Sequence, residues 1–224
     1  MKSFLNPLKL LLLGLNVFLA AYSNSGGSGG SAALGTTWTL RSASLHTVTY
    51  GNGRFVAVGG SGTILTSSDG VTWTVRSSGT TAWLSGVTYG GGLFVAVGEG
   101  GTILTSSDGA MWVVQNSGTE NALIGVTYGN GRFVAVGDEG TILTSSDGVT
   151  WRVQNLATVS TLYGVTYGNG RFVAVGYGGA ILTSPDGVTW TEQTSGTTDW
   201  LEGVTYGNGF FVAVGRSGTI LTSP

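Results

Sequence analysis

Short runs of β-branched and aromatic residues alternate with glycine-containing turns from about residue 38 onward. In one representative unit these runs cover residues 86–89, 93–97, 102–105 and 112–115. Gly-Asn-Gly and Asp-Gly segments join such runs and tolerate positive φ, which makes them strong signals of β-hairpins. No 3.6-residue periodicity appears outside the N-terminal segment. Each unit is therefore predicted to be a four-stranded antiparallel meander without helices.

The same pattern recurs five times along the chain. The phrase Val-Thr-Tyr-Gly-Asn-Gly-Arg-Phe-Val-Ala-Val-Gly, with small variations, has its tyrosine at a spacing of 39, at Tyr50, Tyr89, Tyr128, Tyr167 and Tyr206. The second strand of the first unit is apolar on both sides, with Phe55 and Ala57 on one and Val56 and Val58 on the other. A sheet that is apolar on both faces must lie between two neighbours, as the blades of a propeller do.

We therefore predict an all-β, five-bladed β-propeller with four strands per blade. The fifth unit stops at residue 224, before an outer strand. Residues 38–41, Trp-Thr-Leu-Arg, precede the first unit and resemble an outer strand that has no sheet of its own. These residues are expected to form the outer strand of the last blade and to close the ring, which leaves no open edge and favours a monomer. A parallel β-helix or an open β array is the alternative.

The N-terminal segment is predicted to direct export. Lys2 and Lys9 precede and flank an apolar stretch that ends near Ala21 and is too short to span a bilayer. Residues 1–23 are read as a signal peptide, residues 24–34 as a Gly/Ser-rich linker, and residues 35–224 as the propeller. A secreted, periplasmic or envelope-bound location follows, with membrane attachment only through an uncleaved segment. Tyr22 stands where a bacterial lipoprotein would carry its lipidated cysteine.

The amino-acid composition excludes several kinds of functional site. The chain has 41 glycines among 224 residues, no cysteine, one histidine, and only 9% charged residues. Thiolate metal sites, disulfides and cysteine nucleophiles are excluded, and we expect no metal or cofactor. The formal net charge is −2, and both lysines lie near the N-terminus. This balance argues against nucleic-acid binding, which requires a basic face.

A second repeated phrase, Gly-Thr-Ile-Leu-Thr-Ser-Ser-Asp-Gly-Val-Thr-Trp, resembles the Asp-box, or bacterial neuraminidase repeat, although it is one residue shorter between Asp and Trp. The resemblance covers about residues 35–224 and extends to sialidases, sortilin-type receptors, xyloglucanases and photosystem II assembly factors. It implies a propeller hairpin and says little about function. The residues that carry it are Asp69, Trp73, Asp108, Trp112, Asp147, Trp151, Asp186 and Trp190.

The box residues are interpreted as structural. Paired carboxylates can hydrolyse glycosides, but carboxylates repeated once per blade are dispersed around a ring, and an Asp before Gly can fix its own turn. The tryptophans are expected to pack between blades. A sialidase also needs an arginine cluster and a Tyr–Glu pair at non-repeating positions, whereas Arg54, Arg132 and Arg171 occupy one repeated slot. We therefore predict that the protein is not an enzyme.

Variation between the units gathers on one predicted face, where the second-to-third turns and the blade connections meet. Such loop variation on a fixed scaffold is typical of binding sites, although neutral drift of solvated loops is the alternative. Trp83 and Trp200 are predicted to be exposed there. We predict a binding or scaffold module with a protein partner, a glycan being the alternative that two exposed tryptophans would suit. The candidate residues are His46, Trp83, Glu99, Asp138, Glu139, Tyr163, Tyr177, Trp200, Glu202 and Arg216.

Overall fold

The computed structural model describes residues 44–154 and 160–224. All of them lie in the second of two compact units, residues 42–224. The predicted signal peptide, the linker and the closing strand at 38–41 lie outside the described residues, so these three assignments stay predictions. Within the described ranges, no helix is long and apolar enough to cross a membrane.

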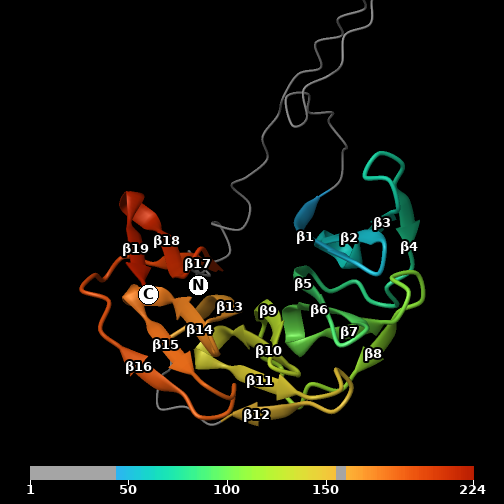
Figure 1. The fold of residues 1–224 in the computed structure, drawn as a ribbon. Helices are drawn as coiled ribbons and strands as arrows, with labels where there is room; N and C mark the ends of the chain where they lie inside the picture. Colours follow the sequence, from blue (N-terminus) through green and yellow to red (C-terminus); the bar gives the residue numbers. More distant parts are fainter. Residues whose placement is uncertain (1–43, 155–159) are drawn as a thin grey trace, which may run out of the picture. The chain divides into compact units, whose positions relative to one another are not determined.

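Five antiparallel sheets follow one another in chain order (Figure 1). Four of them are the predicted four-stranded meanders, and the last has three strands among the described residues. The first sheet contains β1 (Leu45–Gly51), β2 (Arg54–Gly59), β3 (Ile64–Ser67) and β4 (Thr74–Arg76). The second contains β5 (Leu84–Gly90), β6 (Leu93–Gly98), β7 (Ile103–Ser106) and β8 (Val113–Gln115). The third contains β9 (Leu123–Gly129), β10 (Arg132–Gly137), β11 (Ile142–Ser145) and β12 (Arg152–Gln154).

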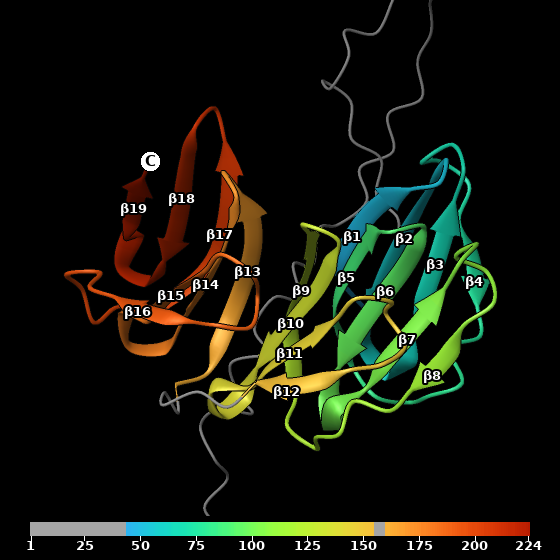
Figure 2. The same ribbon diagram turned by 60° about the horizontal axis from the view of Figure 1, so that its bottom comes forward.

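The remaining sheets continue the series. The fourth sheet contains β13 (Leu162–Gly168), β14 (Arg171–Gly176), β15 (Ile181–Ser184) and β16 (Thr191–Gln193). The fifth contains β17 (Leu201–Gly207), β18 (Phe210–Gly215) and β19 (Ile220–Ser223). Successive first strands pack against each other, β1 on β5, β5 on β9, β9 on β13 and β13 on β17, as Figures 1 and 2 show.

Two kinds of tight turn shape each sheet. The first hairpin turns through two residues of positive φ, for example Asn130 at 48° and Gly131 at 72°, as the Asn-Gly pattern predicts. The second and third strands are joined by a short 3₁₀ turn whose central residue is left-handed, such as Glu139 with φ 54°. These turns are the only helical elements of the described residues: η1 (Gly60–Gly62), η2 (Glu99–Gly101), η3 (Asp138–Gly140), η4 (Tyr177–Gly179) and η5 (Arg216–Gly218).

Each pair of neighbouring sheets shares one hydrophobic core. Between the third and fourth sheets, Val134 and Ile142 meet Leu162 and Phe172, and all four side chains are fully buried. The other three junctions repeat this arrangement with the corresponding residues. In the three middle sheets, the apolar residues on the two faces of the second strand thus enter two different cores, because each of these sheets has a neighbour on both sides.

A tyrosine–glycine contact fixes how closely the sheets approach. A β-carbon added to Gly129, at the end of β9, would collide with the ring of Tyr167 on β13. Gly51, Gly90 and Gly168 face Tyr89, Tyr128 and Tyr206 in the same way. These positions require glycine because the tyrosine ring of the next sheet lies too close for a side chain, and their backbone φ does not itself demand glycine.

In the first and last sheets, one member of this tyrosine–glycine contact has no partner sheet among the described residues. A β-carbon added to Gly207, the fifth copy of the glycine, would have nothing within 4 Å, and Tyr50, the first copy of the tyrosine, is 59% exposed. Ile220 is 67% exposed, whereas its equivalent Ile142 is fully buried. Among the described residues, the first and last sheets therefore do not pack together as consecutive sheets do.

We expect the substitution Gly129→Ala to lower stability while Gly207→Ala leaves it unchanged. The methyl group at residue 129 must displace the ring of Tyr167, and overpacking of this kind costs about 1–3 kcal/mol. Thermal unfolding followed by circular dichroism measures both variants, and the loss at Gly129 corresponds to a melting temperature lower by roughly 2–10 °C. An equal loss at Gly207 would instead indicate that Tyr50 covers Gly207 in solution, as the predicted ring closure requires.

Candidate functional site

The box aspartates lie in the third-to-fourth turns and accept hydrogen bonds from the turn itself. In the third sheet, Asp147 Oδ1 accepts the backbone N–H groups of Thr150 at 2.7 Å and Val149 at 2.9 Å, and the Ser145 hydroxyl at 2.9 Å. Asp69, Asp108 and Asp186 make the same contacts with their own turns. Each carboxylate is thus bonded within its own turn.

These hydrogen bonds lower the pKa of the carboxylates. The backbone N–H groups of Thr150 and Val149 bring the pKa of Asp147 to about 2, and those of Met111 and Ala110 do the same for Asp108. The pKa values of Asp69 and Asp186 are lowered by the equivalent N–H groups. Since a general acid needs a pKa near the working pH, these aspartates are poorly suited to donate protons.

The box tryptophans close the same turns and pack on the sheets. The Trp151 indole N–H donates to the carbonyl of Gly148 at 2.8 Å, and the ring is 9% exposed in the core shared by the second and third sheets. Trp73, Trp112 and Trp190 make the same hydrogen bond and are half-buried. Each ring lies 6.3–6.5 Å from the phenylalanine of its second strand.

The variable residues of the first strands sit on β-bulges. Leu162 pairs with Gly176 and Gly164 pairs with Val175, so Tyr163 has no partner opposite it on β14. The same register shift occurs in every sheet, at His46, Ser85, Ile124, Tyr163 and Glu202. A bulge bends the strand and re-aims its side chain. The sequence indicated variation at this slot but not the bulge.

We call the variable face the surface formed by η1–η5, the five bulge residues and the described residues of the segments that join consecutive sheets. At the junction of the fourth and fifth sheets it carries an aromatic cluster around Trp200. The Trp200 ring lies 4.9 Å from Tyr177 and is stacked on Tyr163 at 5.9 Å. The guanidinium carbon of Arg216 lies 3.5 Å above Trp200, and its Nε donates to Glu202 Oε1 at 3.0 Å.

This cluster brings together five of the predicted site residues, because consecutive sheets place their turns and bulges side by side. Burial raises the pKa of the Tyr163 hydroxyl, with Asp138 and Glu202 adding to the shift and Arg216 opposing it. The prediction that Trp200 is exposed is wrong, since the ring is half-buried beneath the two tyrosines and the arginine. The sequence did not indicate the Arg216–Trp200 stacking.

Trp83 occupies the equivalent position between the first and second sheets and is also half-buried, so the prediction of its exposure is wrong as well. Its ring lies 5.5 Å from that of His46, whose Nδ1 is 3.0 Å from the carbonyl oxygen of Leu84. Because a carbonyl oxygen only accepts, Nδ1 carries the proton. Glu99 lies beside this pair, and its backbone N–H donates to the carbonyl of Trp83 at 2.9 Å.

The variable face is acidic. Only Arg216 supplies a basic side chain among its described residues, apart from the imidazole of His46. Asp138 accepts a hydrogen bond from the Thr161 hydroxyl, and Glu139 accepts one from Asn121. The acids at these turns, bulges and connections are Glu99, Glu120, Asp138, Glu139, Asp199 and Glu202.

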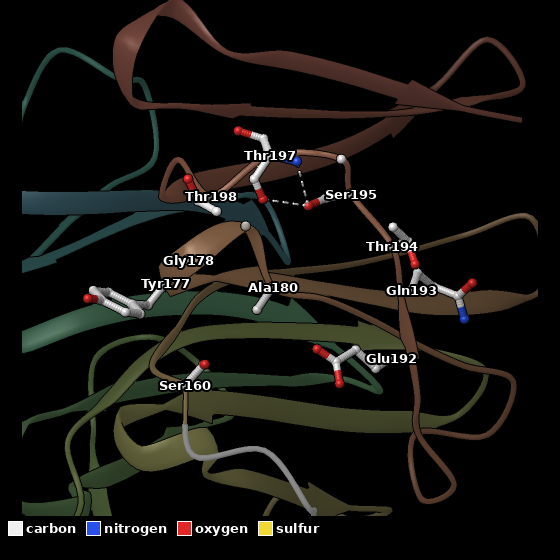
Figure 3. Close-up of a pocket in the computed structure, with 12 residues that line it drawn as sticks. Ser160, Tyr177, Gly178, Ala180, Glu192, Gln193, Thr194, Ser195, Thr197 and Thr198 are labelled. Atoms are coloured by element: carbon white, nitrogen blue, oxygen red, sulfur yellow. Dashed lines mark hydrogen bonds between the residues drawn. The ribbon is translucent and has the colours of Figure 1, made fainter.

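A polar groove adjoins the aromatic cluster and was not predicted (Figure 3). It is lined by Tyr177, by the rest of η4 and by residues 192–198. Among these, Ser195 Oγ donates a hydrogen bond to the carbonyl of Thr197 and accepts one from its backbone N–H. A second groove lies three repeats earlier, over Ser61–Thr63 and residues 75–81. Repeated Ser-Gly-Thr segments form both grooves, which is why the comparison of variable residues overlooked them.

No group of three or more potential metal-ligating His, Cys, Asp or Glu side chains occurs among residues 44–154 and 160–224. No protein-family model matches the chain, and no curated protein matches it. The likeness to the Asp-box therefore stays a prediction.

Solved structures do match, and they show the fold. YCF48 bound to D1 peptide has a TM-score of 0.64 at 20% identity, and YCF48 from Cyanidioschyzon merolae has 0.62 at 18%. The WD40 β-propeller domain of Doa1 has 0.64 at 14%. The alignments cover 80–81% of this chain but 63–66% of those chains, so this chain spans just under two thirds of the length of the YCF48 structures. The described residues have a β-propeller fold of five sheets.

We expect the box carboxylates to make stability fall on acidification. Their folded-state pKa values lie below the ordinary value of 3.8, so their contribution is complete above about pH 5 and is lost as the pH falls toward about 2. Melting temperatures should be measured from pH 6 to pH 2 for the wild type and for a variant with Asn at residues 69, 108, 147 and 186. The variant should show a shallower acid limb, because Asn accepts the same hydrogen bonds without titrating. If the melting temperatures of the wild type and the variant fell equally with pH, the box aspartates would not be the source of the acid sensitivity.

Proposed function

We propose that this chain is a non-enzymatic binding module that recognises a protein partner through its variable face. The observation that carries the proposal is the convergence of Tyr163, Tyr177 and Trp200 at one junction of an otherwise repeated scaffold. Aromatic side chains and arginine in partly desolvated clusters supply most of the affinity in many protein interfaces. Apart from Trp83, which occupies the slot of Trp200, the remaining junctions carry different residues at these slots, which suits one composite surface rather than several identical pockets.

The fold comparisons are compatible with this proposal. One matching structure is YCF48 bound to D1 peptide, so a protein of the same fold holds a peptide. At 20% identity the likeness extends to the fold alone, and the D1 peptide is a ligand of YCF48. What supports peptide or protein binding by this chain is its own variable face.

A basic partner fits this surface best. Six carboxylates are distributed over the described residues of the variable face, against one arginine that is already paired with Glu202. A positively charged partner would be steered toward such a surface, and its association would slow as the salt concentration rises.

Glycan binding is the second candidate, because exposed aromatic rings can stack on sugars. Arg216 already covers one face of Trp200, and the bulge residues differ from sheet to sheet, unlike the repeated sites expected of a lectin built from repeats. Sialidase-type hydrolysis is disfavoured because the aspartates are held in their turns and no arginine cluster stands at non-repeating positions of the sequence. We further propose a secreted or envelope location, on the basis of the N-terminal sequence.

The double substitution of Tyr163 and Trp200 by Ala is expected to weaken partner binding by at least ~2 kcal/mol, about thirty-fold, as for interface hot spots. The measurement is quantitative pull-down from envelope extract, followed by titration of the captured protein. A glycan array run in parallel tests the alternative. Undiminished partner binding, or array binding at several equivalent sites per chain, would contradict the proposal.

Two control variants separate binding from folding. Asn130→Gly lies in a hairpin turn at the opposite end of the sheet and keeps positive φ available, so it should change neither binding nor stability. Trp151→Ala should leave a void between the second and third sheets and cost ~3–5 kcal/mol of stability. Loss of binding in Asn130→Gly with an unchanged melting temperature would show that the site lies on the opposite face.

A further inference from the structure

The first and fourth junctions each carry a tryptophan paired with a second aromatic ring. Trp83 and Trp200 occupy one slot of the connecting segment, and His46 and Tyr163 occupy one bulge slot, three repeats apart. The ring centroids lie 5.5 Å apart in the first pair and 5.9 Å apart in the second. Because the scaffold repeats, the surroundings of the two tryptophans can be compared slot by slot.

At the fourth junction the chain supplies its own cation. Arg216, the first residue of η5, places its guanidinium carbon 3.5 Å above the Trp200 ring. Glu202 on the adjacent bulge accepts a hydrogen bond from its Nε at 3.0 Å. A guanidinium over an indole face gains cation–π energy, and a carboxylate at its edge fixes its orientation.

At the first junction the slot of this arginine holds an acid. Glu99 is the first residue of η2, and it is exposed. Ser85 occupies the bulge slot of Glu202, and Gly60 occupies the slot of Tyr177. A β-carbon on Gly60 would lie 3.8 Å from Trp83 Cε2 and 3.3 Å from the Ser44 hydroxyl, so a small serine side chain, and no aromatic ring, lies where Tyr177 flanks Trp200. The residue in the slot of Arg216 is therefore an acid, whose backbone N–H donates to the carbonyl of Trp83 at 2.9 Å, and no cation–π contact to Trp83 occurs among the described residues.

We propose that Trp83, His46 and Glu99 bind the guanidinium group of an arginine side chain on the protein partner, in the place that Arg216 takes over Trp200. This inference rests on the proposed function and names the chemistry of one of its contacts. The Nδ1 contact with Leu84 holds the imidazole against Trp83, and Glu99 supplies the carboxylate that Glu202 supplies at the other junction. Arginine suits the site better than lysine, since its planar group stacks and can form a bidentate contact with a carboxylate.

The test uses the full chain and the tripeptide N-acetyl-Gly-Arg-Gly-amide, with citrulline in place of arginine as the neutral isostere. Binding is followed by NMR on the indole N–H of Trp83, which is assigned with Trp83→Phe. We expect the arginine peptide to bind roughly ten-fold more tightly than the citrulline peptide. Glu99→Gln should remove most of this difference.

Two further variants exploit the internal comparison. Glu99→Arg with Ser85→Glu introduces the arginine–glutamate pair of the fourth junction at the first junction, so the chain's own arginine should cover Trp83 and abolish peptide binding. Arg216→Glu with Glu202→Ser makes the opposite exchange, and the Trp200 indole signal should then respond to the arginine peptide. Melting temperatures verify that both variants are folded.

Equal binding of the arginine and citrulline peptides to the wild type would overturn the inference. Undiminished binding by the folded variant with Glu99→Arg and Ser85→Glu would overturn it as well. Neither result bears on partner capture that depends on Tyr163 and Trp200, so the proposed function fails only in its own pull-down experiment.

Discussion

The contact between a tyrosine of one inner strand and a glycine of the preceding one is the constraint on which the rest of the structure depends. It sets how closely β9 approaches β13, and the other three junctions repeat it. At that separation the apolar residues of both sheets meet in one buried core, such as the core containing Val134 and Phe172. Burial of these residues supplies the main stabilisation of a chain that has no cysteine for disulfides. The two end sheets show the requirement most plainly, because there the same residue types remain uncovered.

Because these contacts hold the sheets together, residues on the variable face can differ from repeat to repeat. At the end that carries the box turns, Asp147 and Trp151 are bonded within their own turn, and their equivalents are held alike, so this end of the sheets is nearly identical in four units. At the other end each 3₁₀ turn keeps a glycine of positive φ as its third residue, but its left-handed central residue varies, as Ser61, Gly100 and Glu139 show. The bulges then turn one extra side chain per sheet toward this face. A surface can therefore diversify without loss of the core.

The fold determines where the acidic residues lie, and their positions matter more than the net charge. A chain with a net charge of −2 is nearly neutral as a whole. Ten of its eleven acids nevertheless fall into two groups, four in the box turns, where backbone N–H groups hold them, and six on the variable face. The first group serves the fold, and the second creates a field that favours cationic partners. Arg216 above Trp200 is an internal example of the contact that such a surface can make.

Sequence alone determined the β class, the order of strands and the two-residue hairpins, because short-range turn chemistry and two-sided hydrophobicity act within each repeat. It also located the variable slots, including Tyr163, Tyr177 and Trp200. The tertiary structure decided which of those slots meet. Tyr163 and Tyr177 come from the fourth sheet and Trp200 from the segment leading into the fifth, so their contact depends on the angle and spacing between sheets. The half-burial of Trp200 follows from the same packing between sheets, because the residues that cover it are distant in the chain. The bulge at each variable residue is a register shift between the first two strands of its own sheet, which the pattern of apolar residues did not indicate.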